Sequence, residues 1–205
     1  KSSKEVIEKY RERSTESVLG VGLMGMLGIM DHEGFTKTRT VLDFGPDYVI
    51  LGGGQIEYAK RLKEAGITVY FHTPAPDLFK QSVENGIEHV IIEGSEAGGH
   101  ISGYSSLVIW QKILYLLENK EYRKRDLSIV FAGGISTSAG VALLSGMTAP
   151  FSDKRINFGL QAGTLFLASE EIVQRGALDK EYRERILKNN RSVVVSKRIG
   201  RPQRM

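Results

Sequence analysis

The sequence predicts an α/β protein built on a parallel β-sheet. Short β-branched runs alternate with segments of helical period along the 205 residues, and several of the runs end in glycine just before a helix. The composition, 41% hydrophobic and 25% charged, is that of a globular chain with one sizeable core. Alternation of this kind places helices on both faces of a parallel sheet.

Six segments have the length and the β-branched or aromatic content of buried strands. They are Val18–Gly25, Tyr48–Gly52, Thr68–His72, His89–Ile92, Ser128–Phe131 and Ile156–Leu160.

Helical periodicity fills the intervals between these strands. In one such segment Ile56, Ala59 and Leu62 share a face, and Gly66 provides a stop. In the longest one, Trp110 is expected to be a core residue. The expected helices are Lys4–Ser14, Gly34–Phe44, Gln55–Ala65, Pro76–Asn85, Ser105–Asn119, Thr137–Ser145, Leu165–Arg175 and Asp179–Lys188.

Three strand ends carry glycines. The segment 91–100 ends an apolar run in two glycines and a histidine, which offers bare backbone to a flat ring and places a titratable imidazole beside it. The segments 128–134 and 155–164 are also apolar runs that end in glycine before a helical pattern. Repeated strand-glycine-helix junctions are how α/β proteins present backbone N–H groups to phosphate, although each pair alone could be a simple turn. Ser136 or Thr137 could cap the helix that begins after the second junction.

Three motifs, Glu96–His100, Ala132–Ile135 and Gln161–Thr164, occur in the order and spacing of a known family. They resemble the flavin-binding barrels of the nitronate monooxygenase family, also called 2-nitropropane dioxygenase-like, which includes the flavin-dependent enoyl reductases of fatty-acid synthesis. The stretch Ser106–Trp110 and the connection Ser145–Arg155 are similar to flavin-barrel modules of polyketide or fatty-acid synthases. The match covers most of the chain.

The resemblance implies a TIM (β/α)₈ barrel, of which this chain carries six strands. A closed barrel needs eight strands and usually about 250 residues. The family's opening strand, with its Pro-Met pair, has no counterpart here. We therefore expect a barrel domain over residues 1–190 that lacks its first two strands, followed by a basic C-terminal segment, 191–205. An open, doubly wound sheet of six strands is the alternative.

The resemblance also implies FMN as cofactor. FMN suits the chain better than a dinucleotide, because no Gly-x-Gly-x-x-Gly opens it. Gly133 and Gly134 would form the first half of the phosphate cradle. Gly163 and Thr164 would form the second half, and the Thr164 hydroxyl would add a donor. The expected cofactor-binding residues are Gly22, Glu93, Gly98, Gly99, Gly133, Gly134, Gln161, Ala162, Gly163 and Thr164.

His100 is the expected catalytic residue. Its imidazole can polarise a carbonyl or accept a carbon-bound proton near neutral pH, and the family gives this position the same role. Two positions depart from the family pattern. Gly22 stands where nitronate monooxygenases usually have an asparagine. Glu93 stands where they usually have a glutamine, and a glutamate at this position resembles the enoyl reductases. His89 is expected to be structural, while His72 could line the pocket.

These features favour an FMN-dependent oxidoreductase that reduces an enoyl thioester with NAD(P)H. The alternatives are a nitronate monooxygenase, in which His100 is the base and O₂ the oxidant, and a barrel kept as a non-catalytic scaffold in a megasynthase. Acyl carrier protein and other synthase domains are the expected protein partners.

Composition excludes several kinds of partner and site. The net charge of +4 and the pI near 9.2 arise largely from the last nine residues, and a basic tail of this kind is more often solvated than nucleic-acid-binding. The chain has no cysteine, which removes disulfides, thiolate nucleophiles and Cys-ligated metals. The sequence contains no apolar run of about 18 residues, the length that would predict a membrane span. We therefore expect no membrane partner. We also expect a cytoplasmic protein with no nucleic-acid partner and no bound metal.

Overall fold

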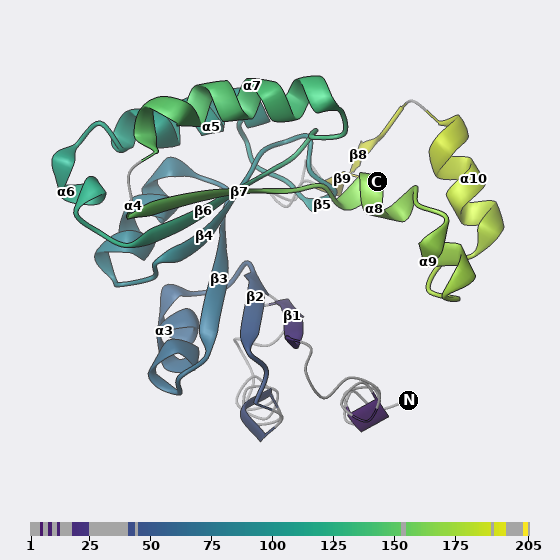
Figure 1. The fold of residues 1–205 in the computed structure, drawn as a ribbon, viewed down its shortest axis with the longest axis horizontal. Coiled ribbons are helices and arrows are strands. Elements are labelled where there is room, and N and C mark those ends of the chain that lie inside the picture. The colour runs from purple at the N-terminus through teal and green to yellow at the C-terminus, as the bar shows by residue number, and fades with distance from the viewer. Residues whose placement is uncertain are drawn as a thin grey trace. The chain divides into compact units, whose positions relative to one another are not determined.

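The structure is a computed structural model, which describes residues 18–24, 41–43, 45–152, 155–189, 191–195 and 203–204, together with residues 5, 8, 9 and 12. The expected helices at 4–14 and 34–44 lie largely outside these residues. The alternation of strands and helices along the rest of the chain is confirmed (Figure 1).

All six expected strands are present, with ends within two residues of the prediction. Their order in the sheet is β1-β2-β3-β4-β6-β7, which is the arrangement of part of a (β/α)₈ barrel. The strands are β1 (Gly20–Met24), β2 (Tyr48–Gly52), β3 (Thr68–Thr73), β4 (His89–Glu93), β6 (Leu127–Ala132) and β7 (Ile156–Gln161).

The chain divides into two compact units, of which the first comprises residues 1–72 and 81–89. Here β1 pairs with β2, and β2 pairs with β3, all in parallel register. Alternate residues of β2 and β3 are buried, and Leu51 and Phe71 are completely so. Helix α3 (Ile56–Glu64) buries Ala59 and Leu62, two residues of the apolar face that its sequence predicted.

The second unit comprises residues 73–80 and 90–205 and holds β4, β6 and β7. Helix α5 (Ser106–Leu116) buries Ile109, Trp110 and Ile113. The Trp110 ring packs edge-on to that of Phe131, with centroids 5.9 Å apart, so Trp110 is a core residue as expected. Between α5 and β6 lies the short helix α6 (Lys120–Arg123), and α7 (Ser138–Thr148) joins β6 to β7. Helix α4 (Pro76–Glu84) connects β3 to β4.

After β7 the chain forms three helices. The segment expected to be one helix at 165–175 is divided into α8 (Gly163–Leu167) and α9 (Glu171–Gln174), and α10 (Lys180–Lys188) follows.

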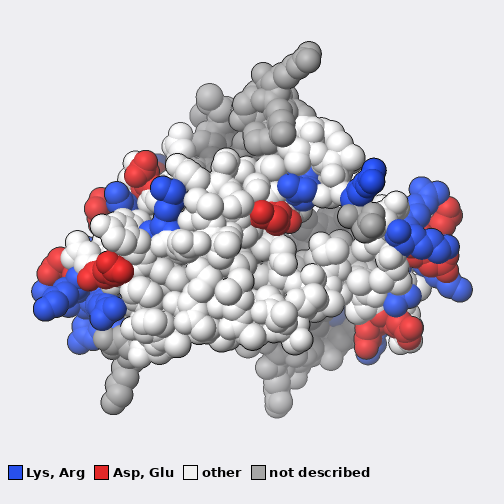
Figure 2. Space-filling view, turned by 90° about the horizontal axis from the view of Figure 1, so that it is seen from above, with Lys and Arg blue, Asp and Glu red and all other residues white. Residues whose placement is uncertain are grey.

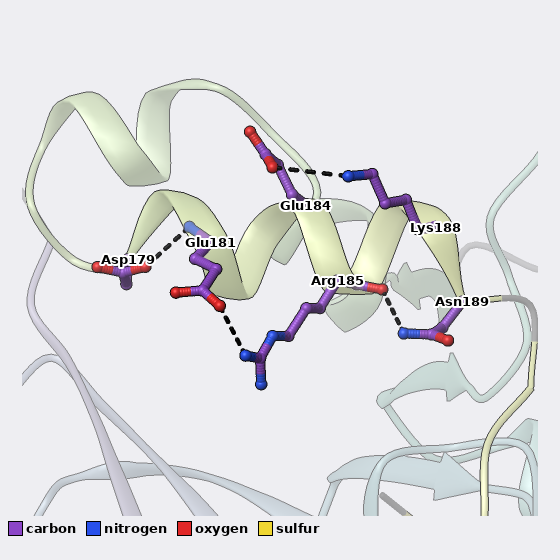
Figure 3. A network of polar contacts seen from close by, with 6 residues as sticks. All are labelled: Asp179, Glu181, Glu184, Arg185, Lys188 and Asn189. Atoms are coloured by element: carbon purple, nitrogen blue, oxygen red, sulfur yellow. Dashed lines mark hydrogen bonds and ion pairs between the residues drawn. The ribbon is translucent and has the colours of Figure 1, made fainter.

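Helix α10 has no fully buried residue, and polar contacts are prominent in it. One of them leaves the helix, since Arg183 Nε donates to the Ala168 carbonyl at 2.7 Å. The Asp179 side chain caps its first turn, accepting a bond of 2.8 Å from the Glu181 N–H. Arg185 pairs with Glu181 at 2.6 Å, one turn away (Figure 3).

A second, three-stranded sheet was not predicted from the sequence. It consists of β5 (Gly99–His100), β9 (Gln203–Arg204) and β8 (Val194–Val195), in the order β5-β9-β8, and both pairings are antiparallel. Part of the basic C-terminal segment is therefore paired with the histidine segment instead of being solvated.

Figure 2 shows the face that carries α7. Helix α7 contains no charged residue, and the charged side chains gather instead over the ends of the view where α6 and α10 lie. Among the described residues, no helix combines the length and apolar character that crossing a bilayer requires.

Candidate active site

Three strand ends of the second unit lie next to one another. In the register of β6 and β7, Ala132 is opposite Gln161. At the end of β4, the Gly94 N–H donates to the Ala132 carbonyl at 3.3 Å. The three glycine-bearing motifs therefore meet at one edge of the sheet. The carboxyl ends of parallel strands are where α/β proteins bind their ligands.

Glu96, which the sequence did not single out beyond its motif, anchors the segment after β4. Its Oε2 accepts hydrogen bonds from both the backbone N–H and the hydroxyl of Ser106, each at 2.6 Å. Ser106 is the first residue of α5, so the carboxylate caps this helix from ten residues upstream. Burial alone would raise the pKa of Glu96, but the Ser106 hydrogen bonds outweigh it and hold the pKa below its usual value.

Two glycines at this edge are required by the packing of the α5 N-terminus. A Cβ on Gly94 would overlap the backbone and hydroxyl of Ser106. A Cβ on Gly133 would overlap the Ser106 hydroxyl and lie 3.2 Å from the Ala97 nitrogen. Gly133 is buried and has a φ of +103°, a conformation that favours glycine. Close packing of protein atoms accounts for these two glycines without any ligand.

Gly134, by contrast, is exposed. Its φ is +73°, and a Cβ there would lie 3.2 Å from Cβ of Glu96. The helix that follows begins as expected, because the Thr137 hydroxyl accepts a bond of 3.1 Å from the Gly140 N–H. Thr137 is thus the cap of α7, one of the two candidates that the sequence offered.

The end of β7 is open. Gln161, Gly163 and Thr164 are exposed, and Ala162 is the N-cap residue of α8. A Cβ on Gly163 would meet no atom of the described residues within 4 Å beyond its own helix, and its φ is not in the left-handed region. Within the described part of the chain, backbone at this strand end is therefore accessible to a ligand, and no packing contact there requires a glycine.

The glycines of the histidine motif are also open. Gly98 and Gly99 are exposed, and a Cβ on either would meet no atom within 4 Å. His100 follows in β5, where its backbone pairs with Gln203. Glu93, the last residue of β4, is half-buried just before this segment.

Gly22 is the one expected site residue in the first unit. It lies in β1, opposite Ile50 of β2, and is exposed, and no atom of the described residues lies within 4 Å of the position of a Cβ.

His89 belongs to the opposite end of its strand and is packed as a structural residue. Its ring lies against that of Tyr70, with centroids 5.0 Å apart. Burial lowers the pKa of His89, and the neighbouring Lys63 lowers it further against the opposing effect of Glu88. The lowered pKa favours the neutral form of the ring, which lies at the start of β4, away from the glycines that follow the strand.

Comparison with known proteins gives the family and the fold. The curated relative (3aS,4S,5R,7aS)-5-hydroxy-7a-methyl-1-oxo-octahydro-1H-indene-4-carboxyl-CoA dehydrogenase of Rhodococcus jostii (strain RHA1) is 27% identical over 150 residues, which is 73% of this chain and 37% of that protein. FabK of Thermotoga maritima is similar in structure, with a TM-score of 0.73 and 22% identity over 100% of this chain and 60% of that chain.

Nitroalkane oxidase of Streptomyces ansochromogenes is similar with a TM-score of 0.57 and 22% identity, over 100% of this chain and 58% of that chain. The chain thus spans less than two thirds of the length of each of these relatives. The family model for nitronate monooxygenase matches residues 1–205. From the match of this family model over the whole chain, the chain belongs to the nitronate monooxygenase family, and it shares its fold with the two solved structures.

Proposed function

We propose that this chain is the flavin-binding part of an FMN-dependent oxidoreductase that reduces an enoyl thioester. The observation that carries the proposal is the open backbone at Gly163, at the end of β7 and beside the end of β6. At Gly163 no atom of the described residues beyond its own helix stands within 4 Å of a Cβ position, and close approach of a ligand needs such open backbone at the edge where barrels bind phosphate.

The residues at this edge fit FMN. Gly134, Gly163 and Thr164 are exposed at two neighbouring strand ends, where backbone N–H groups and a hydroxyl can receive a phosphate. Gln161 and Gly98 are exposed beside them and are the residues that would contact the flavin ring. Relatives in the family are generally flavin-dependent. FMN, when bound, would supply the two-electron redox chemistry.

His100 is the residue that would hold or move a proton. It stands directly after the two open glycines, so a substrate carbonyl could approach the backbone beside it. For a thioester, the imidazole would donate a hydrogen bond to the carbonyl oxygen or assist protonation of the carbon chain.

Two observations support a thioester as the substrate. The Rhodococcus relative is named as a carboxyl-CoA dehydrogenase. The second observation is Glu93, because a glutamate at this position resembles the enoyl reductases. Nitronate oxidation is the second candidate, and it is favoured by the description of the family model and by the similarity to nitroalkane oxidase. In that reaction His100 would be the base.

An anaerobic titration of the full-length protein would separate these candidates. For a reductase, NADH or NADPH bleaches the flavin absorption bands, and crotonyl-CoA or crotonyl-acyl carrier protein restores them. Restoration by the carrier-bound thioester at lower concentration would identify acyl carrier protein as the partner. Turnover of an alkyl nitronate with O₂, without response to crotonyl thioesters, would contradict the reductase proposal. A protein without flavin bands would support the scaffold alternative.

Gly163→Val tests the cofactor site. We expect a sharp loss of FMN, since the branched side chain would occupy the approach of the phosphate. Gly146→Val in α7 is the matched control, because that helical glycine also has no atom within 4 Å of its Cβ position. Normal flavin content in Gly163→Val would contradict the assignment. Gly134→Val is a poorer test, since a positive φ there strains any side chain.

His100→Ala tests the chemistry. We expect the flavin to remain bound while turnover falls by about 10²- to 10⁴-fold, the usual contribution of a positioned acid or base. Full activity in this variant would show that another group moves the proton.

A further inference from the structure

The tip of the histidine segment is joined to the far end of the described chain. The base of this segment is fixed locally, because Glu96 caps α5 and the Ser95 N–H donates to the Tyr104 carbonyl at 2.8 Å. Beyond the base stand Gly98 and Gly99, the second with a φ of +77°. Two adjacent glycines allow many backbone conformations, so their sequence does not fix the position of His100.

Strand β9 supplies the missing constraint at the tip. Gly99 and His100 pair antiparallel with Arg204 and Gln203, and β9 lies between β5 and β8 (Figure 1). A ladder of two residues is weak by itself. A side-chain contact therefore has to help hold the tip in place.

Arg204 makes that contact. Its Nε donates to the Ser95 carbonyl at 2.7 Å, and its Nη1 donates to the Ser192 hydroxyl at 2.5 Å. One guanidinium thus joins the base of the histidine segment to the approach to β8, while the backbone of the same residue pairs with Gly99. The planar fork of arginine suits two fixed acceptors, and lysine cannot reproduce it.

We propose that Arg204 is a positioning residue that sets the place of His100 at the site. The glycine pair lies between its two attachments, one at Ser95 and one along β5. With both attachments made, the glycines have little freedom left, and the histidine backbone is held relative to the strand ends. What His100 does there rests on the proposed function, but the positioning itself does not.

Loss of the Arg204 side chain should loosen the segment locally without unfolding the core. Local opening of this kind is detected by amide hydrogen exchange. A catalytic group displaced by about 1 Å can cost on the order of 10²-fold in rate. We therefore expect faster exchange in residues 95–104 and a fall in kcat of about 10- to 100-fold with little change in KM.

The experiment compares Arg204→Met and Arg204→Lys with Arg191→Met in the full-length protein. Methionine keeps the aliphatic stem and removes the donors, and Arg191 is an exposed arginine of the same C-terminal segment. Hydrogen exchange of the 95–104 peptide is measured with and without flavin, followed by flavin content, thermal midpoint, kcat, KM and the pH profile of kcat. We expect both Arg204 variants, and not Arg191→Met, to accelerate exchange, to lower kcat and to displace the pH profile, at normal flavin content.

Two results would overturn the proposal. One is exchange in residues 95–104 that matches the control in both Arg204 variants. The other is faster exchange with unchanged kcat and an unchanged pH profile, which would leave Arg204 merely structural. Failure of the proposed function gives a different pattern, since the unmodified protein would then lack flavin or thioester turnover while the exchange comparison would still report on Arg204.

Discussion

Gly94 and Gly133 face the first residue of α5, whereas Gly163 faces open space. In the sequence all three are glycines at the ends of apolar strands. In the fold, a Cβ at either of the first two would collide with Ser106, whereas a Cβ at the third would have no atom within 4 Å among the described residues outside its own helix. Glycine at a strand end can thus serve either the packing of the protein or the approach of a ligand. Only the surroundings distinguish the two.

The largest expected effect is that of Gly94→Ala. The added methyl group would overlap the backbone of Ser106 in a buried position, and overpacking of this kind costs about 3 kcal/mol of unfolding free energy. Denaturant unfolding measures this loss, and Gly98→Ala, where space is open, should change stability by less than about 0.5 kcal/mol. Equal stability of the two variants would remove the distinction between packing and approach glycines.

Gly94 and Gly133 leave room for Ser106, and the Glu96 carboxylate accepts hydrogen bonds from Ser106. Glu96→Gln weakens this cap, and we expect an intermediate effect on stability. A glutamine keeps one acceptor but loses the charge, and capping losses are about 1 kcal/mol, less at an exposed site. Thermal unfolding at neutral pH would measure the loss of stability in Glu96→Gln.

The difference in stability between the unmodified protein and Glu96→Gln should depend on pH with a definite sign. The pKa of Glu96 is lowered in the fold from its usual 4.5, so its contribution is fully present above pH 4.5 and is lost as the pH falls through the lower folded pKa. The stability gap between Glu96→Gln and the unmodified protein should therefore close on acidification. A gap that stays constant down to pH 3 would contradict the hydrogen-bonded carboxylate.

The smallest effect on stability, and one of opposite sign, is expected for Gly163→Ala. Gly163 is the first residue of α8, without a positive φ or a close neighbour, so alanine there should stabilise the flavin-free protein by about 0.5 kcal/mol. Flavin affinity should fall in the same variant if the phosphate approaches this backbone. Unfolding of the flavin-free protein measures the gain in stability, and flavin titration measures the loss of affinity. Lower stability of the flavin-free variant would place Gly163 among the packing glycines.

Local patterns were sufficient to predict most of the sheet. Tyr48–Gly52 was predicted with its ends as observed, because its β-branched run is bounded by turn residues. Thr137 as a cap and Trp110 as a core residue likewise follow from short-range signals. The three glycine motifs meet at one edge because successive parallel strands point the same way.

Contacts between distant residues were not predictable in this way. Nothing near Glu96 indicates that its carboxylate caps a helix ten residues later. The strands β5, β8 and β9 have two residues each, too few to show a period. They are defined by their pairing with one another, and the pairing of β5 with β9 joins segments that are distant in sequence. The division of the expected helix at 165–175 into α8 and α9 was also missed, because the apolar period continues across residues 168–170.

The pairing of β5 with β9 also affects the order of events in folding. Arg204 bonds to Ser95 across 109 residues of chain, and a loop of that length must close before this contact can form. Chains are synthesised from the N-terminus at about 5–20 residues per second, so the sheet strands emerge before β9 does. The histidine segment is therefore among the last parts to become ordered, and a growing chain with its first sheet already in place would still lack a finished site.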